Sequence, residues 1–324
     1  MPAPRPTFSV LVQLMKLRVI LLLQVTAICS VFIHDLLVRA EVMAHPEGRR
    51  WIQTLSTCWL VLLGGTLSAG GANAINMWYD RDIDAQMTRT QSRPIPNHQV
   101  EPTVALLFGI LVSILGVVML LILHPIAAFW SAFSVAFYVL VYTMWLKRRT
   151  PQNIVIGGIA GATPPLIGWA AAAEASLGTN PLALGSAIPW TLFLLIFLWT
   201  PPHFWALALY RSGEYARAGI PMMNEVRGAE HTLLQSKVYA VLLIALAFVP
   251  LLWPEDHLAW PWIPLAGALG FWYAASVFAI DPHERKDRNG RIPSAFASFM
   301  RSLRYLAFMH VALVGVAALS PYLA

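Results

Sequence analysis

The sequence predicts an all-α protein that crosses a membrane many times. Hydrophobic residues make up 58% of the 324 residues and charged residues only 12%, well below the roughly 25% that is usual in soluble domains. Apolar runs of about 20 residues, the length that spans a bilayer as a helix, recur nine times along the chain. Because backbone polar groups find no water in hydrocarbon, such runs are expected to be helices.

Connections of different lengths separate the nine expected spans. They cover residues 17–38, 52–75, 103–123, 126–146, 154–173, 189–210, 236–253, 261–280 and 303–322. The two cysteines, Cys29 and Cys58, lie in apolar runs and show no disulfide or metal-binding pattern. We therefore expect a single integral-membrane domain, residues 1–324, in which residues 1–16 form a cytoplasmic tail.

The positions of the cations predict the orientation. With the N-terminus inside, 19 of the 22 Lys and Arg residues fall in cytoplasmic segments, as the positive-inside rule requires. This placement accounts for the net charge of +6, so a nucleic-acid partner is excluded. An odd number of spans puts the C-terminus outside, and the polar-rich connections near 76–102, 147–153, 211–235 and 281–302 then share the cytoplasmic face of the cell inner membrane.

The most informative stretch begins where the second span reaches this face. If the helix continues, Asn76, Asp80 and Asp84 lie at i, i+4 and i+8 and share one side of it, whereas Asp82 points elsewhere. Carboxylate and carboxamide oxygens are the ligands that Mg²⁺ prefers when it also keeps waters and binds phosphate. We call these three residues the acidic ladder, and it predicts a magnesium site at the mouth of the bundle.

Basic residues near the acidic ladder are candidates for binding the same phosphate-bearing substrate. Arg89 and Arg93 follow the ladder directly. Lys147, at the end of the fourth span, is placed to reach back over the bundle mouth as a diphosphate partner. Arg148 and Arg149 fit this role and fit equally well a role as topology anchors that reach lipid phosphates.

The fifth span combines glycines with a Pro-Pro pair. In the stretch from Gly157 to Trp169, the glycines permit close helix packing and Pro164-Pro165 interrupts helical hydrogen bonding. Two interpretations remain open: a kinked packing helix, or a wall opened to make room for a flat, bulky substrate.

The sixth span carries a histidine directly after a second Pro-Pro pair. A histidine within a span is a functional candidate, although a lone histidine is more often a simple hydrogen-bonded residue, so both interpretations of His203 stay open. In the segment that follows, Glu214 is the acid that could complete a second metal site facing the acidic ladder.

These motifs together resemble a known family. Asn76-x₃-Asp80-x₃-Asp84, followed by Arg89-Thr90 and Arg93-Pro94, resembles the first acidic motif of the UbiA-type intramembrane aromatic prenyltransferases. The stretches 147–158, 161–169, 200–208 and 218–222 resemble the protohaem IX farnesyltransferases, or haem O synthases, within that superfamily. The resemblance covers about residues 15–320. It departs from the family pattern at Glu214, where the family has Asp, and after Met222, where the family tends to Leu-Pro-Val-Val.

The resemblance implies a fold of nine transmembrane helices around a central cavity. It also implies a Mg²⁺-dependent enzyme that transfers the farnesyl group of farnesyl diphosphate to a vinyl group of haem B, with addition of water, to give haem O for haem-copper oxidases. A haem A synthase or a terminal oxidase assembly would be the partner downstream.

The resemblance also assigns roles to individual residues. The metal ligands would be Asn76, Asp80, Asp84 and Glu214. The diphosphate would be bound by Asn76, Arg89, Arg93, Lys147, Arg148 and Asn153. The catalytic residues would be Asp80, Asp84, Lys147 and His203, of which His203 would orient a water, accept its proton, or lie near the haem iron.

Three other functions compete with this one. A UbiA-type enzyme acting on another aromatic acceptor, such as a quinone precursor, would share the acidic ladder but not the histidine stretch. A transporter with an intramembrane ion site predicts two related halves, which the sequence does not show. A non-catalytic haem-delivery protein would bind haem without consuming farnesyl diphosphate.

Overall fold

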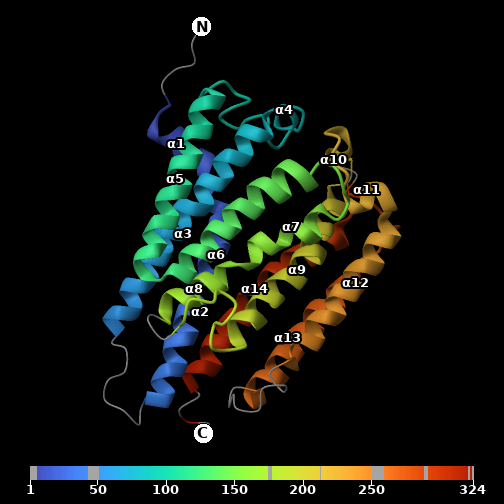
Figure 1. The fold of residues 1–324 in the computed structure, drawn as a ribbon. Coiled ribbons are helices and arrows are strands. Elements are labelled where there is room, and N and C mark those ends of the chain that lie inside the picture. Colours follow the sequence, from blue (N-terminus) through green and yellow to red (C-terminus); the bar gives the residue numbers. More distant parts are fainter. Residues whose placement is uncertain are drawn as a thin grey trace.

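The computed structural model describes residues 6–42, 51–173, 177–211, 213–249, 259–287, 291–319 and 322. Within these ranges every regular element is a helix, so the predicted all-α class is confirmed (Figure 1). The long elements are α2 (Leu17–Val42), α3 (Trp51–Tyr79), α5 (Pro102–Leu123), α6 (Pro125–Ala136) with its π-helical continuation η1 (Phe137–Leu146), α7 (Asn153–Ala162), α8 (Pro164–Ala172), α9 (Ile188–Tyr210), α12 (Ala229–Leu246), α13 (Ala259–Phe278) and α14 (Pro293–Leu319). The short helices are α1 (Phe8–Met15), α4 (Arg81–Asp84), α10 (Glu214–Arg217) and α11 (Met223–Arg227).

Seven helical segments in the described part are long and apolar enough to cross a membrane. They correspond to the first six expected spans and the ninth. The helices α12 and α13 overlap the seventh and eighth expected spans but are not among these seven segments. The first turn of α12 contains the polar residues Glu230 and His231, and Lys237 follows. The helices therefore indicate a multi-pass membrane protein, and the count of nine spans stays a prediction.

Two helices begin earlier than hydropathy predicts. α12 starts at Ala229 rather than at residue 236, and α14 starts at Pro293 rather than at 303. Hydropathy marks only the apolar part of a helix, whereas polar first turns continue the same helix beyond it. A cation in each of these helices lies against an aromatic ring: Lys237 is 5.4 Å from the Phe278 ring, and Arg301 is 5.4 Å from the Trp272 ring.

The long helices pack in a closed order. α2 packs on α3, α3 on α5, α5 on α6, η1 on α7, α7 on α9, α9 on α12, α12 on α13, α13 on α14, and α14 packs back on α2. In Figure 1, α3 and α5 form one edge of the bundle and α12 and α13 the opposite edge. This order agrees with the expected arrangement of spans around a centre.

The fifth expected span is broken as predicted. α7 ends at Ala162 and α8 begins at Pro164, so the Pro-Pro pair starts a new helix. A Cβ added to Gly157 would lie 2.3 Å from the Tyr142 ring, whereas one added to Gly161 would meet nothing within 4 Å. The packing interpretation therefore explains Gly157, and the space beside Gly161 is open.

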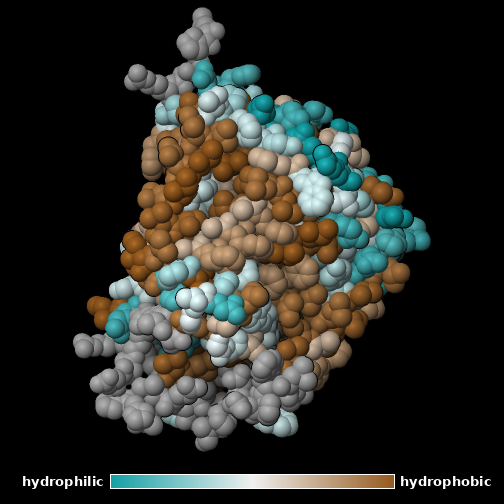
Figure 2. All heavy atoms as spheres, in the orientation of Figure 1, coloured by the Kyte–Doolittle hydropathy of each residue, from teal (hydrophilic) through white to brown (hydrophobic). Residues whose placement is uncertain are grey.

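The polar connections gather at one end of the bundle. α4, α10 and α11 lie at the end that also holds the N-terminus, opposite the C-terminus (Figure 1). Hydrophilic residues cover this end, and hydrophobic residues cover the body of the face seen in Figure 2. Below them, Ile83 and Met87 pack in one apolar cluster with Ile154, Ile220 and Met222. The segments that follow the second, fourth and sixth spans therefore meet, as the sequence predicts.

A close backbone contact joins α3 and α5. A Cβ added to Gly116 would lie 2.3 Å from the Ser68 backbone nitrogen and 2.5 Å from the Gly64 carbonyl oxygen, far inside contact distance. We expect Gly116→Ala to lower the free energy of unfolding by about 1–3 kcal/mol, because the added methyl group overpacks this interface. Thermal unfolding of the purified protein in detergent measures the change.

Gly267→Ala in α13 is the matched control, since a Cβ there meets nothing within 4 Å. Its melting temperature should stay the same or rise slightly, because Ala favours helix over Gly. An equal loss of stability in both variants would contradict the close α3–α5 contact.

Candidate functional site

The acidic ladder lies at the junction of α3 and α4. α3 ends at Tyr79 and α4 begins at Arg81, yet hydrogen bonds from Asp80 N to Asn76 O (2.9 Å) and from Asp84 N to Asp80 O (2.8 Å) keep the helical spacing across the junction. The three ladder residues are at most 3% exposed. Since a buried carboxylate is costly without a partner, their contacts define the site.

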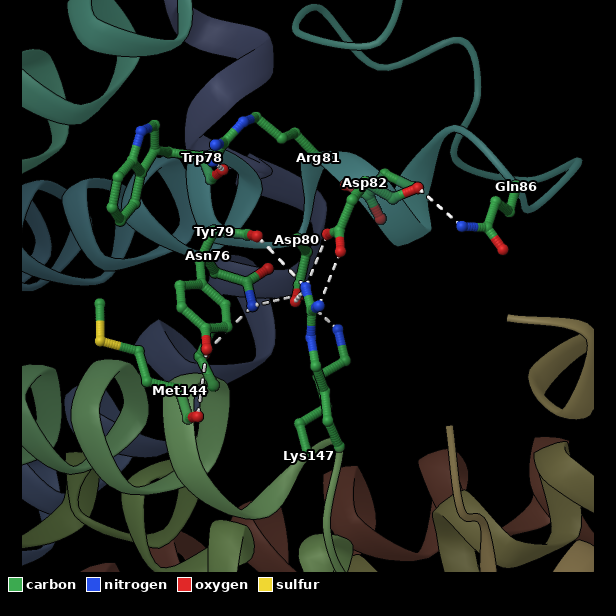
Figure 3. A network of polar contacts seen from close by, with 12 residues as sticks. Asn76, Trp78, Tyr79, Asp80, Arg81, Asp82, Gln86, Met144 and Lys147 are labelled. Carbon is green, nitrogen blue, oxygen red and sulfur yellow. Dashed lines mark hydrogen bonds and ion pairs between the residues drawn. The ribbon is translucent and has the colours of Figure 1, made fainter. Parts of the chain in front are cut away.

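Lys147 is the partner of Asp80. It follows η1 directly, and its Nζ donates to Asp80 Oδ2 (Figure 3). Asn76 Nδ2 donates to the same carboxylate oxygen at 2.9 Å and to Thr143 Oγ1 at 3.1 Å. The structure therefore brings Lys147 back over the bundle mouth to the ladder, as the sequence predicts.

The π-helical winding of η1 makes this contact possible. Tyr138, Thr143 and Lys147 contact Asn73, Asn76 and Asp80, in that order. The partners on α3 are three and four residues apart, as in an α-helix, whereas those on η1 are five and four residues apart.

In an α-helix, Tyr138 and Lys147 would differ by about 180° and face opposite sides. Hydrogen bonds from residue i to i+5 give a wider turn, seen here in the bond from Lys147 N to Tyr142 O (2.9 Å). The wider turn keeps all three side chains facing α3.

The other two carboxylates of the motif are paired as well. Arg93 Nη1 donates to both oxygens of Asp84, at 2.7 and 2.6 Å. Arg148 donates to both oxygens of Asp82, each at 2.7 Å, and this pairing lowers the pKa of Asp82 and raises that of Arg148. Asp82 and Asp84 are thus each paired with an arginine, and Arg148 also lies 3.6 Å from Asp80.

Lys16 is a site residue that sequence reasoning missed. It lies between α1 and α2 in the left-handed conformation (φ 54°), and its Nζ donates to Asn76 Oδ1 at 2.8 Å. Burial holds the pKa of Lys16 well below its usual value; nearby Arg93 and Lys147 lower it further, and Asp84 and Asp80 partly oppose them. The sequence offered one signal, a lysine directly before the first apolar run, which we counted only toward topology.

The residues of the ladder fit a hard cation that arrives with a phosphate ligand. Among the described residues, no three His, Cys, Asp or Glu side chains converge as metal ligands. One oxygen, Asp80 Oδ1, is nevertheless buried without a hydrogen bond, 3.6 Å from Arg148 Nη2. Mg²⁺ takes such oxygens and completes its shell with water and phosphate oxygens. The Asn76 carboxamide oxygen faces Lys16 instead, so this residue orients Asp80 here.

The remaining predicted residues differ in their relation to the ladder. Arg89 is exposed and has no hydrogen bond or ion pair within the described part of the chain, so it is free to meet an anion. Asn153, only 1% exposed, donates instead to the backbone oxygens of Thr150 (2.7 Å) and Pro221 (3.3 Å). It joins the turn before α7 to the segment before α11. Glu214 begins α10, and its side chain lies outside the described residues.

His203 lies on α9 and faces α14, away from the contacts of the ladder. Its ring is stacked between Trp199 (4.1 Å) and Phe299 (4.7 Å), and Nδ1 is 2.6 Å from Ser302 Oγ. The Ser302 hydroxyl donates to the Phe299 carbonyl oxygen at 2.6 Å. Since a serine has one proton to donate, the hydrogen on Nδ1 points to Ser302, and Nε2 carries the lone pair.

Comparison with known proteins identifies a matching family and named relatives. The model of the UbiA prenyltransferase family matches residues 42–303. A relative from Rhodopseudomonas palustris named "Protoheme IX farnesyltransferase" is 41% identical over 95% of this chain and 90% of its own length. A Mesorhizobium japonicum relative named "Protoheme IX farnesyltransferase 2" is 47% identical over 76% of this chain and 75% of its own length.

Solved structures show the same fold at low identity. A UbiA homologue from Aeropyrum pernix has a TM-score of 0.67 at 17% identity, over 90% of this chain and 97% of that one. A UbiA homologue from Archaeoglobus fulgidus bound to GPP and Mg²⁺ has a TM-score of 0.62 at 16% identity, over 94% of this chain and 99% of that one. The chain belongs to the UbiA prenyltransferase family and, within it, to the protohaem IX farnesyltransferases.

Proposed function

We propose that this chain is a Mg²⁺-dependent enzyme that transfers the farnesyl group of farnesyl diphosphate to a vinyl group of haem B. The observation that carries the proposal is a buried network of acids and cations, Asp80 with Lys147 and Asp84 with Arg93, at the polar end of an apolar bundle. The identity of the acceptor is taken from the names of the relatives, which match up to 95% of this chain in sequence.

The headgroup of farnesyl diphosphate binds at the acidic ladder in this proposal. Asp80 and Asp84 hold Mg²⁺, which neutralises charge on the diphosphate and on the departing group. Lys147 and Arg93 turn from the carboxylates to the diphosphate oxygens, and Arg89 joins them. Such contacts act most strongly in a site from which water is excluded.

The farnesyl tail lies among the apolar helices, where its allylic cation is kept from water. Breaking the C1–O bond leaves the electron pair on the diphosphate. The π electrons of a haem vinyl group then form a carbon–carbon bond to C1. The cation left on the porphyrin side takes up water and loses a proton, which gives the hydroxyethylfarnesyl group of haem O. Early access of water would instead hydrolyse the farnesyl cation.

His203 is proposed for the final water step. Its unprotonated Nε2 suits either orienting the water and accepting its proton, or lying near the haem iron. Ser302 and the two stacked rings support this tautomer and ring position.

The cellular setting is part of the same proposal. Residues 1–324 form one enzyme domain in the cell inner membrane, with residues 1–16 and the acidic ladder on the cytoplasmic side and the C-terminus outside. The distribution of Lys and Arg supports this orientation. A haem A synthase or an assembling haem-copper oxidase receives the product.

The reaction is tested with membranes that contain the protein, supplied with haem B, farnesyl diphosphate and Mg²⁺. We expect a new haem that is heavier by one farnesyl group plus one hydroxyl group and that disappears when a chelator is added. Farnesyl diphosphate consumed with unchanged haem would indicate another aromatic acceptor. If neither substrate changes, the catalytic proposal is wrong.

The metal ligands are tested by Asp80→Asn and Asp84→Asn. Each change should lower turnover at least about 100-fold, because it removes a charge that holds Mg²⁺ against the diphosphate. Size-exclusion chromatography in detergent should show that both variants still fold. Glu230→Gln removes an exposed carboxylate and serves as the control; normal turnover in either ladder variant would refute the assignment.

Lys16 is tested through the affinity for farnesyl diphosphate. Lys16→Met should raise the dissociation constant about tenfold, because a charge-assisted hydrogen bond near the headgroup is lost, and Lys16→Arg should retain most of the affinity. Arg18→Gln removes an exposed cation two residues away and should have no effect. Equal affinity of Lys16→Met and the unchanged protein would assign Lys16 a purely structural role.

A further inference from the structure

The guanidinium group of Arg148 forms its hydrogen bonds with groups of the protein itself. Nη1 and Nη2 donate to the two oxygens of Asp82, both at 2.7 Å, and Nη2 also donates to the Tyr79 carbonyl oxygen at 3.3 Å. Two parallel bonds between a guanidinium and a carboxylate fix orientation as well as distance. The turn after η1 is therefore held to the start of α4.

Tyr79 contacts residues on both sides of Lys147 in the sequence. Its ring lies 5.0 Å from the Arg148 guanidinium carbon, and its hydroxyl donates to the Met144 carbonyl oxygen at 3.3 Å (Figure 3). Lys147 lies between these two contacts in sequence. Together they hold it where its ammonium meets Asp80.

The position of Lys147 needs such support because η1 is a π-helix. Wide π turns are rare and usually short, and rewinding to an α-helix would rotate Lys147 away from α3. The polar contacts of Tyr138 and Thr143 hold the interior of η1. The contacts of Arg148 hold its end.

The same contacts keep Arg148 at ion-pair distance from Asp80 and prevent it from donating a hydrogen bond to that carboxylate. Asp80 Oδ1 is buried without a hydrogen bond, and Arg148 Nη2 is only 3.6 Å from it. Without Asp82, the guanidinium would be free to move closer and donate a hydrogen bond to this oxygen. The Asp82 side chain is 56% exposed, so Asp82 itself is poorly placed to hold a metal in a water-poor site.

We propose that Asp82 and Arg148 form a latch that positions Lys147 on Asp80 and leaves Asp80 Oδ1 open to the metal. Both are positioning residues and neither contacts the substrate. The inference rests on the proposed function, since the ligand it serves is the magnesium diphosphate headgroup, and it replaces the expected role of Arg148 as a diphosphate ligand.

The test measures binding of farnesyl diphosphate by calorimetry, without haem, to Asp82→Asn, Arg148→Gln and the double variant. Both single changes should raise the dissociation constant about fivefold, since Lys147 is then no longer held at the ladder, from where it can turn to the diphosphate. Asp82→Asn should also raise the Mg²⁺ concentration for half-maximal binding about fivefold, because the freed Arg148 competes for Asp80. Arg148→Gln should leave that Mg²⁺ concentration unchanged, and the double variant should behave like Arg148→Gln.

The control is Arg149→Gln, which removes the neighbouring cation. Arg149 is exposed and its side chain makes no hydrogen bond or ion pair within the described residues, so this variant should bind normally. Unchanged affinity and Mg²⁺ dependence in Asp82→Asn, or effects of the two single changes that multiply in the double variant, would overturn the latch. Because no acceptor is present, this result is independent of whether the enzyme farnesylates haem.

Discussion

The ion pair between Asp80 and Lys147 is the interaction on which the site depends. Asp80 is fully buried, and a carboxylate in that position is tolerated only with a cation and hydrogen bonds around it. Arg93 does the same for Asp84. Without ligands, the charges of the two carboxylates are therefore neutralised by cations of the protein itself. A divalent cation alone would enter among cations, and a diphosphate alone would approach carboxylates. In the proposed mechanism, their arrival together would let each acid exchange its cation for the metal, while each cation would turn to phosphate.

The geometry of this pair comes from two helices with different windings. α3 presents its polar side chains every three or four residues, and η1 presents Tyr138, Thr143 and Lys147 every five or four. The contact would be lost if both helices had the same pitch. The widened turn also needs space, which Gly157 provides beside the Tyr142 ring. A feature of backbone winding thus decides which side chains reach the ladder.

Much of this arrangement could be predicted from the sequence, because hydropathy and the α-helical period are local properties. They identified the long helices, the acidic ladder and the position of Lys147 at the mouth of the bundle. They could not identify the contacts that depend on tertiary structure. Lys16 itself adopts the left-handed conformation between two helices and so reaches Asn76. No periodic pattern in the sequence predicts this contact. Arg148 and Asn153 were placed near the site, but their choice of Asp82 and of backbone carbonyls depends on how separate segments meet.

The central claim is that metal and diphosphate must bind together to open the paired network. It is tested most directly by titrating farnesyl diphosphate into the purified protein by calorimetry, once with Mg²⁺ and once with a chelator. We expect binding to be at least about tenfold weaker with the chelator, because Lys147 and Arg93 then stay with their carboxylates. Equal affinity under both conditions would show that the diphosphate displaces these cations without a metal, and would contradict the account.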